Sequence, residues 1–391
     1  MLELTANTDA GARLVRLAES LAQELARRAP EHDRAASFPH ASVAALKEAG
    51  YFTAPIPAEL GGLGVTSVHD VVVASSRLAR GDASVAIGVN MHFAVLLNMV
   101  RRWLAAVAAG DERRARAFGS SMQAIARDGV IMATAISEPG QDLTRPSTTA
   151  TRTESGWRID GRKIFCTMSP AATVLQTAVT FAGDDGVERY GYAAIDPATD
   201  GVRIHDDWDA LGMRASGSNS VTFSDVEVPL SALRGGFLAG DADAYMDRNL
   251  VAGLFHASAS LGIAEAAVAT SNAAVREPDA RARTLVAENA IELGACRATL
   301  ARAAALVDES DEPLLELFAE AQAAKAFVNE AAARIVDRAL ALSGGAGYLN
   351  GHPLARAYRD VRAGSFMQPL GANRAYELLG DVALGREPAL H

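Results

Sequence analysis

The stretch SGGAGYLNGHPLARAYRDVRAGSFMQPLGANRAYE, residues 343–377, decides the fold. Its first part, residues 344–348, can turn tightly and bring the backbone close to a flat ligand, because glycine has no Cβ to collide with that ligand. The middle carries the pair Arg359 and Asp360 between apolar residues. The chain breaks at Pro369, which cannot continue a helix, and the pattern then predicts a last helix.

These motifs and their order resemble the C-terminal signature of the acyl-CoA dehydrogenase superfamily, which has GGxGY, then YRD, then a catalytic glutamate eight residues after the aspartate. The eighth residue after Asp360 is Gln368, whose amide has no basic site near neutral pH. Glu377 lies nine residues further on, roughly 13 Å along a helix, which is too far to substitute. A subgroup has its base ten residues before the glycine corresponding to Gly262, where this chain has Ala252. Both base positions of the family therefore lack a carboxylate.

Composition limits the function classes. The chain has 391 residues, of which 49% are hydrophobic, enough to bury two or three packed layers. A net charge of −10 without a basic stripe argues against nucleic acid as a ligand. We expect no signal peptide and no membrane span. Cys166 and Cys296 fit a reduced cytoplasm and give no metal-ligand spacing, so we expect no metal site.

Helical periodicity covers the first part of the chain, and alternation follows it. Apolar spacing predicts helices over 11–28, 40–49, 67–80, 83–103 and 111–127. Strand-like alternation separated by turn signals predicts strands over 147–153, 157–159, 174–181, 190–195 and 220–228. Short strands at this spacing indicate a small β-barrel or sandwich.

Long amphipathic helices return over 247–270, 281–307 and 313–343. Together with the last helix they predict a four-helix bundle, which commonly packs against copies of itself, so we expect a homo-oligomer, a dimer or a tetramer. The predicted fold is α+β and mostly α, of the acyl-CoA dehydrogenase type. Its domains are an N-terminal helical domain (1–130), a middle β domain (131–232) and a C-terminal bundle (233–391).

Two further motifs resemble flavin-contact segments of the same family. Residues 133–139, ATAISEP, resemble "A.TEP", in which the hydroxyl contacts the flavin N5 edge, and residues 163–167, KIFCT, resemble "K.WIT". The matches LGMRAS at 211–216 and FSDVEVP at 223–229 follow in family order. The resemblance implies flavin contacts from Ile136, Ser137, Phe165, Cys166, Thr167, Gly344, Gly345 and Met367. A hydroxyl that caps a turn stays an alternative for Ser137 and for Thr167.

Several residues that bind CoA and the adenosine part of FAD in the family are missing from this sequence. The Gly-Ser-Asp that follows the Glu-Pro pair in relatives is replaced here by residues 140–142, GQD, which argues against CoA; Arg145 can reach an anionic substrate or stay solvated. The "R..FG" loop and the glutamine that hold the ADP half of FAD are missing, with Ala341 at the glutamine position and Leu370 at that of a family threonine. FMN, or a reduced flavin that comes and goes, is therefore favoured, and FAD stays possible.

His92 lies inside an otherwise apolar helix. It is either a core histidine or a base that lines the substrate cavity, as in oxygenase relatives, and its ordinary pKa near 6.5 suits proton transfer. His256 lies on an apolar face and is predicted to be a core residue. Glu288 and Glu292 are predicted to be surface or interface charges. HExxH, P-loop and GxGxxG motifs are missing, so zinc hydrolysis and Rossmann binding lack support.

The first hypothesis is a flavin-dependent oxidoreductase that acts as a two-component monooxygenase. Reduced flavin would come from a separate reductase and would react with O2 on a small-molecule substrate, with His92, Ser137 and Gln368 as catalytic residues. One alternative is an acyl-thioester α,β-dehydrogenase with a relocated base. Another is a non-catalytic flavin- or ligand-binding relative, against which the retained Ser137, Phe165 and Thr167 argue.

Overall fold

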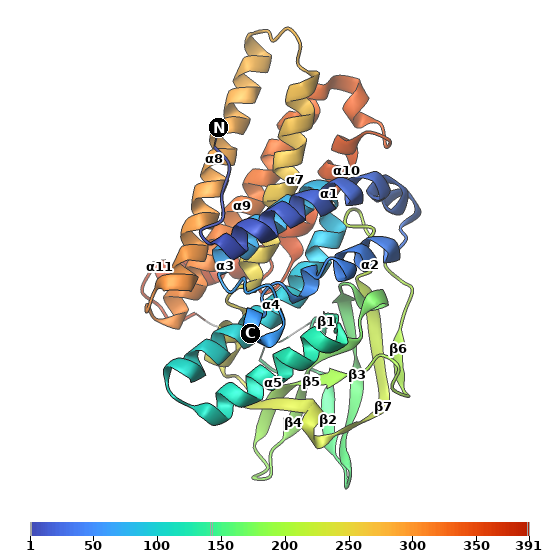
Figure 1. Cartoon of the computed structure of the whole chain (residues 1–391), viewed down its shortest axis with the longest axis vertical. Coiled ribbons are helices and arrows are strands. Elements are labelled where there is room, and N and C mark those ends of the chain that lie inside the picture. The colour runs from blue at the N-terminus through green and yellow to red at the C-terminus, as the bar shows by residue number, and fades with distance from the viewer. Residues whose placement is uncertain (1, 141, 143, 389, 391) are drawn as a thin grey trace.

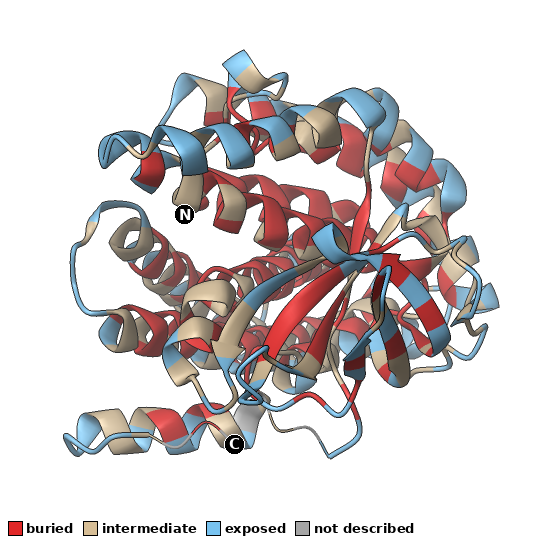
Figure 2. Cartoon of the chain, turned by 90° about the horizontal axis from the view of Figure 1, so that it is seen from below, coloured by how far each residue is buried: buried red, intermediate tan, exposed pale blue. Residues whose placement is uncertain are grey.

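The computed structural model describes residues 2–140, 142, 144–388 and 390. N-terminal helices, a central sheet and C-terminal helices follow one another along the chain, and Figure 1 shows the sheet at one end of the molecule with the long helices rising from it. Buried residues gather on the inward faces of these helices and on the sheet, while outer turns are exposed (Figure 2). This mostly helical α+β architecture confirms the predicted fold class.

The N-terminal part forms the five predicted helices. They are α1 (Asp9–Ala35), α2 (His40–Glu48), α3 (Val68–Gly81), α4 (Ala83–Ala108) and α5 (Glu112–Asp128), with 3-10 turns η1 (Tyr51–Thr53) and η2 (Ala58–Leu60) before α3. Polar caps set several starts: Asp82, for example, accepts hydrogen bonds from the backbone N–H groups of Ser84 and Val85. Helix α1 continues past residue 28 through Pro30, because burial of Ala29 and Asp33 supports its last turns.

The strands form one sheet in the order β6-β7-β3-β2-β4-β5-β8, with β1 paired to β4. Their bounds are β1 (Met132–Ala135), β2 (Thr149–Arg152), β3 (Gly156–Cys166), β4 (Val174–Ala182), β5 (Glu188–Ile195), β6 (Val202–Ile204), β7 (Asn219–Pro229) and β8 (Leu233–Leu238), with 3-10 turns η3 (Ser169–Ala171) and η4 (Leu230–Ala232). The sequence analysis missed β1, β6 and β8. Strands β1 and β6 are short, and β8, LRGGFL, has two central glycines that interrupt its alternation. Because β8 pairs with β5, the sheet continues past residue 232, and the domain boundaries stay predictions.

The C-terminal helices are α6 (Ala242–Asn249), α7 (Ala252–Ala274), α8 (Ala280–Glu309), α9 (Leu314–Ser343), α10 (Pro353–Asp360) and α11 (Ala372–Ala383), with 3-10 turns η5 (Gly344–Tyr348) and η6 (Val361–Phe366). Helix α7 is buried along most of its length between α3, α4 and α9. Two segments, Ala83–Ala108 and Ala242–Ala274, are long and apolar enough to cross a membrane, but 83% of each apolar window is buried, as in the core helices of a soluble fold.

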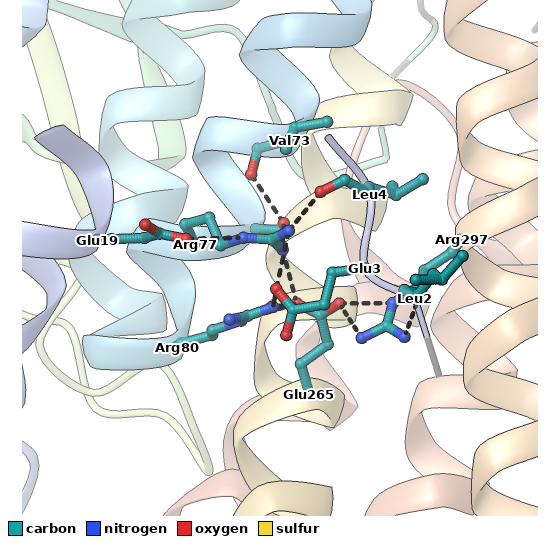
Figure 3. A network of polar contacts seen from close by, with 10 residues as sticks. Leu2, Glu3, Leu4, Glu19, Val73, Arg77, Arg80, Glu265 and Arg297 are labelled. Atoms are coloured by element: carbon teal, nitrogen blue, oxygen red, sulfur yellow. Dashed lines mark hydrogen bonds and ion pairs between the residues drawn. The ribbon is translucent and has the colours of Figure 1, made fainter. Parts of the chain in front are cut away.

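A buried ionic cluster joins α3, α7 and α8 to the N-terminal segment (Figure 3). The Glu265 carboxylate accepts hydrogen bonds from Arg77 at 3.2 Å and from Arg297 at 2.9 Å. The same two guanidiniums donate to the backbone carbonyls of Leu4 and Leu2, at 2.6 Å and 3.1 Å. Charges and carbonyls thus satisfy each other, and the cluster fixes the start of the chain against the helical core.

Candidate functional site

A cavity of about 480 Å³ lies where α4, the sheet, α6, α7 and the segment 359–369 meet. Helix α4 contributes Met91 and Asn98, and the α6–α7 region contributes Arg248 and His256. The rest of the wall comes from the ends of β1 and β3 and from the loop 208–218. Segments that are far apart in the sequence therefore build one chamber, in which the two flavin-contact motifs face the C-terminal segment.

The motifs around residues 137 and 165 form one wall. Ile136, Ser137, Phe165 and Thr167 line the cavity, and the Ser137 carbonyl accepts the Ile164 N–H at 2.9 Å, which ties the two motifs together. These four predicted residues are thus brought together. Their shared surface combines an aromatic ring with hydroxyl groups, which suits the apolar faces and polar edge of a tricyclic ring.

An irregularity in β3 turns Phe165 outward. The register of β3 against β7 shifts between Lys163 and Cys166, and Phe165 has a positive φ of 54°. Its ring is therefore 59% exposed and contacts Trp208 edge-on, with ring centroids 5.8 Å apart. The same turn directs Cys166 inward, where it is fully buried and burial raises its pKa to about 12. Cys166 is not among the residues that line the cavity, and its flavin contact stays a prediction.

Glu138 is the only carboxylate among the described residues that line the cavity. It accepts hydrogen bonds from the Ser147 N–H, from the backbone and hydroxyl of Thr148 and from the Lys163 ammonium at 2.5 Å. Burial alone would raise the pKa of Glu138, but Lys163 and the hydroxyl and backbone donors outweigh burial and lower the pKa to about 2. Because these donors hold it, Glu138 is a poor proton acceptor.

Gln368 occupies the cavity wall together with Met367 and Pro369, while the catalytic role of Gln368 and the flavin contact of Met367 stay predictions. Lys325 of α9 donates hydrogen bonds to the backbone carbonyls of Met367 and Leu370, on either side of Gln368. Burial lowers the pKa of Lys325 to about 7. The segment is therefore held from behind, with Gln368 in the cavity wall.

The two alternative base positions supply no carboxylate to the cavity. Ala252 lines the wall without a polar side chain, and Glu377 is exposed on α11, outside the lining. Gly344 and Gly345 lie on the exposed turn η5 and likewise do not line the cavity, so the structure does not bring them to the other predicted flavin contacts.

His92 is fully buried and lies outside the cavity lining. The Met132 backbone N–H donates to His92 Nδ1 at 3.1 Å, so the Nε2–H donates to the Phe52 carbonyl at 2.9 Å. Burial lowers the pKa of His92 to about 4. Both ring nitrogens are therefore used to join α4 to its neighbours, which corrects the prediction that His92 lines the cavity as a proton carrier.

His256 lines the cavity, although its apolar neighbours had placed it in the core. Within the residues that the structure describes, its buried Nδ1 has no protein hydrogen-bond partner, and the same is true of both amide atoms of Gln322 on α9. Burial, assisted by the positive charge of Lys325, lowers the pKa of His256 to about 3, so the imidazole is neutral at pH 7. Sequence periodicity carried no signal for this position, because a cavity wall and a core are equally apolar.

The family of this chain follows from comparison with known proteins. Models of the acyl-CoA dehydrogenase N-terminal, middle and C-terminal domains match residues 13–111, 133–226 and 250–374. The chain belongs to the acyl-CoA dehydrogenase family, as its motifs predicted, and is a flavin-dependent oxidoreductase of the monooxygenase-like branch.

Within this family the chain is similar to amino sugar nitrososynthase RubN8 of Streptomyces rubradiris, with 35% identity over 98% of this chain and 92% of the relative. The structure of KijD3 in complex with FMN and dTDP-3-amino-2,3,6-trideoxy-4-keto-3-methyl-D-glucose has a TM-score of 0.89 and 33% identity, covering 99% of this chain and 97% of the other. FMN-bound TdsC from Paenibacillus sp. A11-2 has a TM-score of 0.83 and 25% identity, with coverages of 97% and 99%.

Proposed function

We propose that the protein is a two-component, FMN-dependent monooxygenase that oxidises the amino group of a nucleotide-linked amino sugar. Two comparisons support the substrate class. The relative with 35% identity is named an amino sugar nitrososynthase, and the KijD3 structure holds FMN together with a dTDP-linked amino sugar. A separate reductase completes the proposal, because the sequence has no GxGxxG motif for a nicotinamide cofactor.

The observation that carries the proposal is the state of the carboxylates around the cavity. Abstraction of an α-proton from a thioester needs a basic carboxylate, and the described lining offers only Glu138, which Lys163 and its other donors occupy. At the family's base position Gln368 supplies an amide, which accepts or donates a hydrogen bond but takes no proton. Oxygen transfer to an amine needs no such base, so the cavity suits it better.

Charge around the cavity also suits an amine substrate. Arg248 lies in its wall, and Lys325 lies behind Gln368. Nearby cations disfavour a second positive charge and lower the pKa of a bound amine. The amine then stays neutral, and its nitrogen keeps the lone pair that reacts with the oxidant.

The residues present fit a flavin ring. Phe165 and Trp208 offer aromatic surface, while Ser137 and Thr167 offer hydroxyl groups beside it, and Thr167 is held by Ser218 at 2.9 Å between hydroxyl oxygens. We assign these residues to binding and orienting FMN. A bound reduced flavin supplies two electrons to O2, so that one oxygen atom reaches the substrate and the other leaves as water.

The chemistry balances in two rounds. In the first, R–NH2, O2 and reduced flavin give R–NHOH, water and oxidised flavin. In the second, R–NHOH, O2 and reduced flavin give R–N=O, two waters and oxidised flavin. The neutral His256, whose imidazole belongs to the cavity lining, is proposed to hydrogen-bond the substrate's polar group during both rounds. It takes the place that the sequence had suggested for His92.

The test combines the purified protein, chemically reduced FMN, O2 and a dTDP-linked 3-amino sugar. We expect mass spectrometry to show hydroxylamine and nitroso products, and catalase to leave their formation unchanged. Boiled protein and oxidised FMN are the controls. Release of hydrogen peroxide alone with every amino sugar, combined with anaerobic flavin reduction by an acyl-CoA, would overturn the proposal in favour of a thioester dehydrogenase.

We further infer a homo-oligomer, a dimer or a tetramer, in the cytoplasm. The C-terminal surface exposes Tyr348, Leu349 and Phe366, at 82%, 65% and 81%, which supports burial of this region against another copy. Both cysteines are free, which fits a reducing compartment. Light scattering after gel filtration measures the assembly, and a monomer at micromolar concentration would contradict it.

A further inference from the structure

We infer that Arg248 is the anchor for a phosphate group at the end of the cavity formed by α4, α6 and the sheet. The inference rests on the proposed function for the identity of the ligand, but the site itself is argued from charge and contacts. Arg248 lies in the last turn of α6 and lines the cavity. The Asn98 amide donates to the carbonyls of Asp247 and Arg248, at 3.1 Å and 3.4 Å, which fixes this end of α6 against α4.

Arg248 differs from the other two arginines of the cavity wall in its charge balance. Arg359 pairs with Asp33 at 2.5 Å, and Arg362 pairs with Asp337 at 2.6 Å. Among the residues that the structure describes, no carboxylate forms an ion pair with Arg248. One guanidinium in the wall therefore has no ion-pair partner within the described part of the chain and is available to an anionic ligand.

The neighbouring carboxylate does not fill this role. Asp247 is engaged by Arg102 at 2.7 Å and by Arg101 at 3.6 Å. Two arginines thus hold the Asp247 carboxylate, and it forms no ion pair with Arg248. Burial lowers the pKa of Arg248, and the charge of Arg102 acts in the same direction, so an added anion would relieve both effects.

The contacts that Arg248 does make orient it without neutralising it. Its guanidinium carbon lies 3.5 Å from the ring centroid of Tyr192, and one Nη2–H donates to the Gln176 side-chain carbonyl. These two contacts cover one face and use one of five N–H donors. The remaining donors form a planar fork, the geometry that binds phosphate oxygens in pairs.

Phosphate is the anion that the proposed ligands share. A nucleotide-linked sugar carries a diphosphate and FMN carries a single phosphate. We commit to the diphosphate of the substrate, because Phe165 and Ser137 assign the flavin ring to another wall. The experiment separates the two sources by measuring each ligand alone.

Calorimetric titrations with dTDP, thymidine and FMN are compared for the wild type, Arg248→Met and Arg248→Lys. Arg248→Met keeps the stem that packs on Tyr192 but removes the charge, so we expect the dTDP dissociation constant to rise roughly 30-fold. Arg248→Lys keeps a charge without the fork, and a rise of about fivefold is expected. Affinities for thymidine and FMN should stay unchanged. Arg127→Gln on the exposed end of α5 is the matched control for losing one positive charge.

Unchanged affinities for both dTDP and FMN in folded Arg248 variants would overturn the inference, as would equal weakening in Arg127→Gln. Weaker FMN binding with normal dTDP binding would keep the phosphate site and assign it to the flavin. If Arg248→Met does not fold, Arg248→Lys and competition by inorganic pyrophosphate in the wild type carry the test. Because binding is measured without turnover, these results are separate from success or failure of amine oxidation.

Discussion

The buried arginines of the cluster around Glu265 and the half-buried Arg248 of the cavity wall differ in their charge balance. Arg77 and Arg297 form ion pairs with the carboxylate of Glu265 and donate hydrogen bonds to two backbone carbonyls of the N-terminal segment (Figure 3). Their positive charges are therefore paired within the chain. Arg248 in the cavity wall contacts an aromatic face and an amide, and no carboxylate of the described residues forms an ion pair with it. Removing a charge from water is costly unless the charge is paired. The paired cluster around Glu265 is therefore structural, whereas the unpaired charge of Arg248 supports the proposed binding of an anion.

The largest expected effect on stability comes from removing the shared carboxylate of the cluster around Glu265. In Glu265→Gln the guanidiniums of Arg77 and Arg297 would lose their shared carboxylate, and we expect the free energy of unfolding to fall by about 4 kcal/mol. Urea denaturation measures the change. Glu320→Gln, which removes an exposed partner of Arg302, should cost less than about 1 kcal/mol. Equal losses in the two variants would show that the cluster contributes no more than a surface pair.

His92 provides the second test, because it belongs to the structural group rather than to the cavity. Its pKa is about 4 in the folded protein and 6.5 ordinarily, so between these values the unfolded chain binds a proton that the folded one excludes. Stability is therefore complete above pH 6.5 and falls as the pH decreases toward 4, by about 3 kcal/mol for this group.

We expect His92→Gln to make the unfolding free energy less dependent on pH over that window, as measured by urea titration at several pH values. The exposed His40→Gln is the control and should keep the wild-type slope. A His92→Gln slope equal to that of the wild type would mean that His92 is protonated in the folded state, as a proton carrier can be.

Substitutions of Gln368 in the cavity wall test whether an amine binds beside it. Gln368→Glu places a carboxylate beside the proposed amine and favours its charged form, so kcat/KM at pH 7 should fall roughly tenfold and the pH profile should move upward. Gln368→Met, which is neutral, should leave the profile where it is. An unshifted profile in Gln368→Glu would argue that no amine binds near this residue.

The smallest effect is expected at Phe165. Phe165→Gly relieves the positive φ but removes the ring, so we expect stability within about 0.5 kcal/mol of the wild type, because relief of strain and the added freedom of glycine oppose each other. FMN affinity, measured by fluorescence quenching, should fall roughly fivefold. Phe165→Leu keeps apolar volume without an aromatic face, and wild-type FMN affinity in both variants would remove Phe165 from the flavin site.

Local patterns predicted one wall of the site. Ser137, Phe165, Thr167, Met367 and Gln368 all line the cavity, because each follows a turn or strand motif whose geometry is set by its immediate neighbours. The same patterns failed for isolated residues on helices. His92 follows Met91 on α4, yet Met91 lines the cavity and His92 points to Phe52 and the sheet. One residue turns a helix by about 100°, so only packing decides which of the two faces the chamber.

The order of motifs and the hydrophobic periods, read from the amino acids alone, determined the family, the mixed architecture and the amide at the usual base position. Tertiary packing decided which charges are paired. Glu265 and Asp33 pair with arginines that are distant in the sequence, whereas no carboxylate of the described residues pairs with Arg248. Periodicity records that a side chain is inside, whereas the identity of its neighbours depends on segments that only folding brings together.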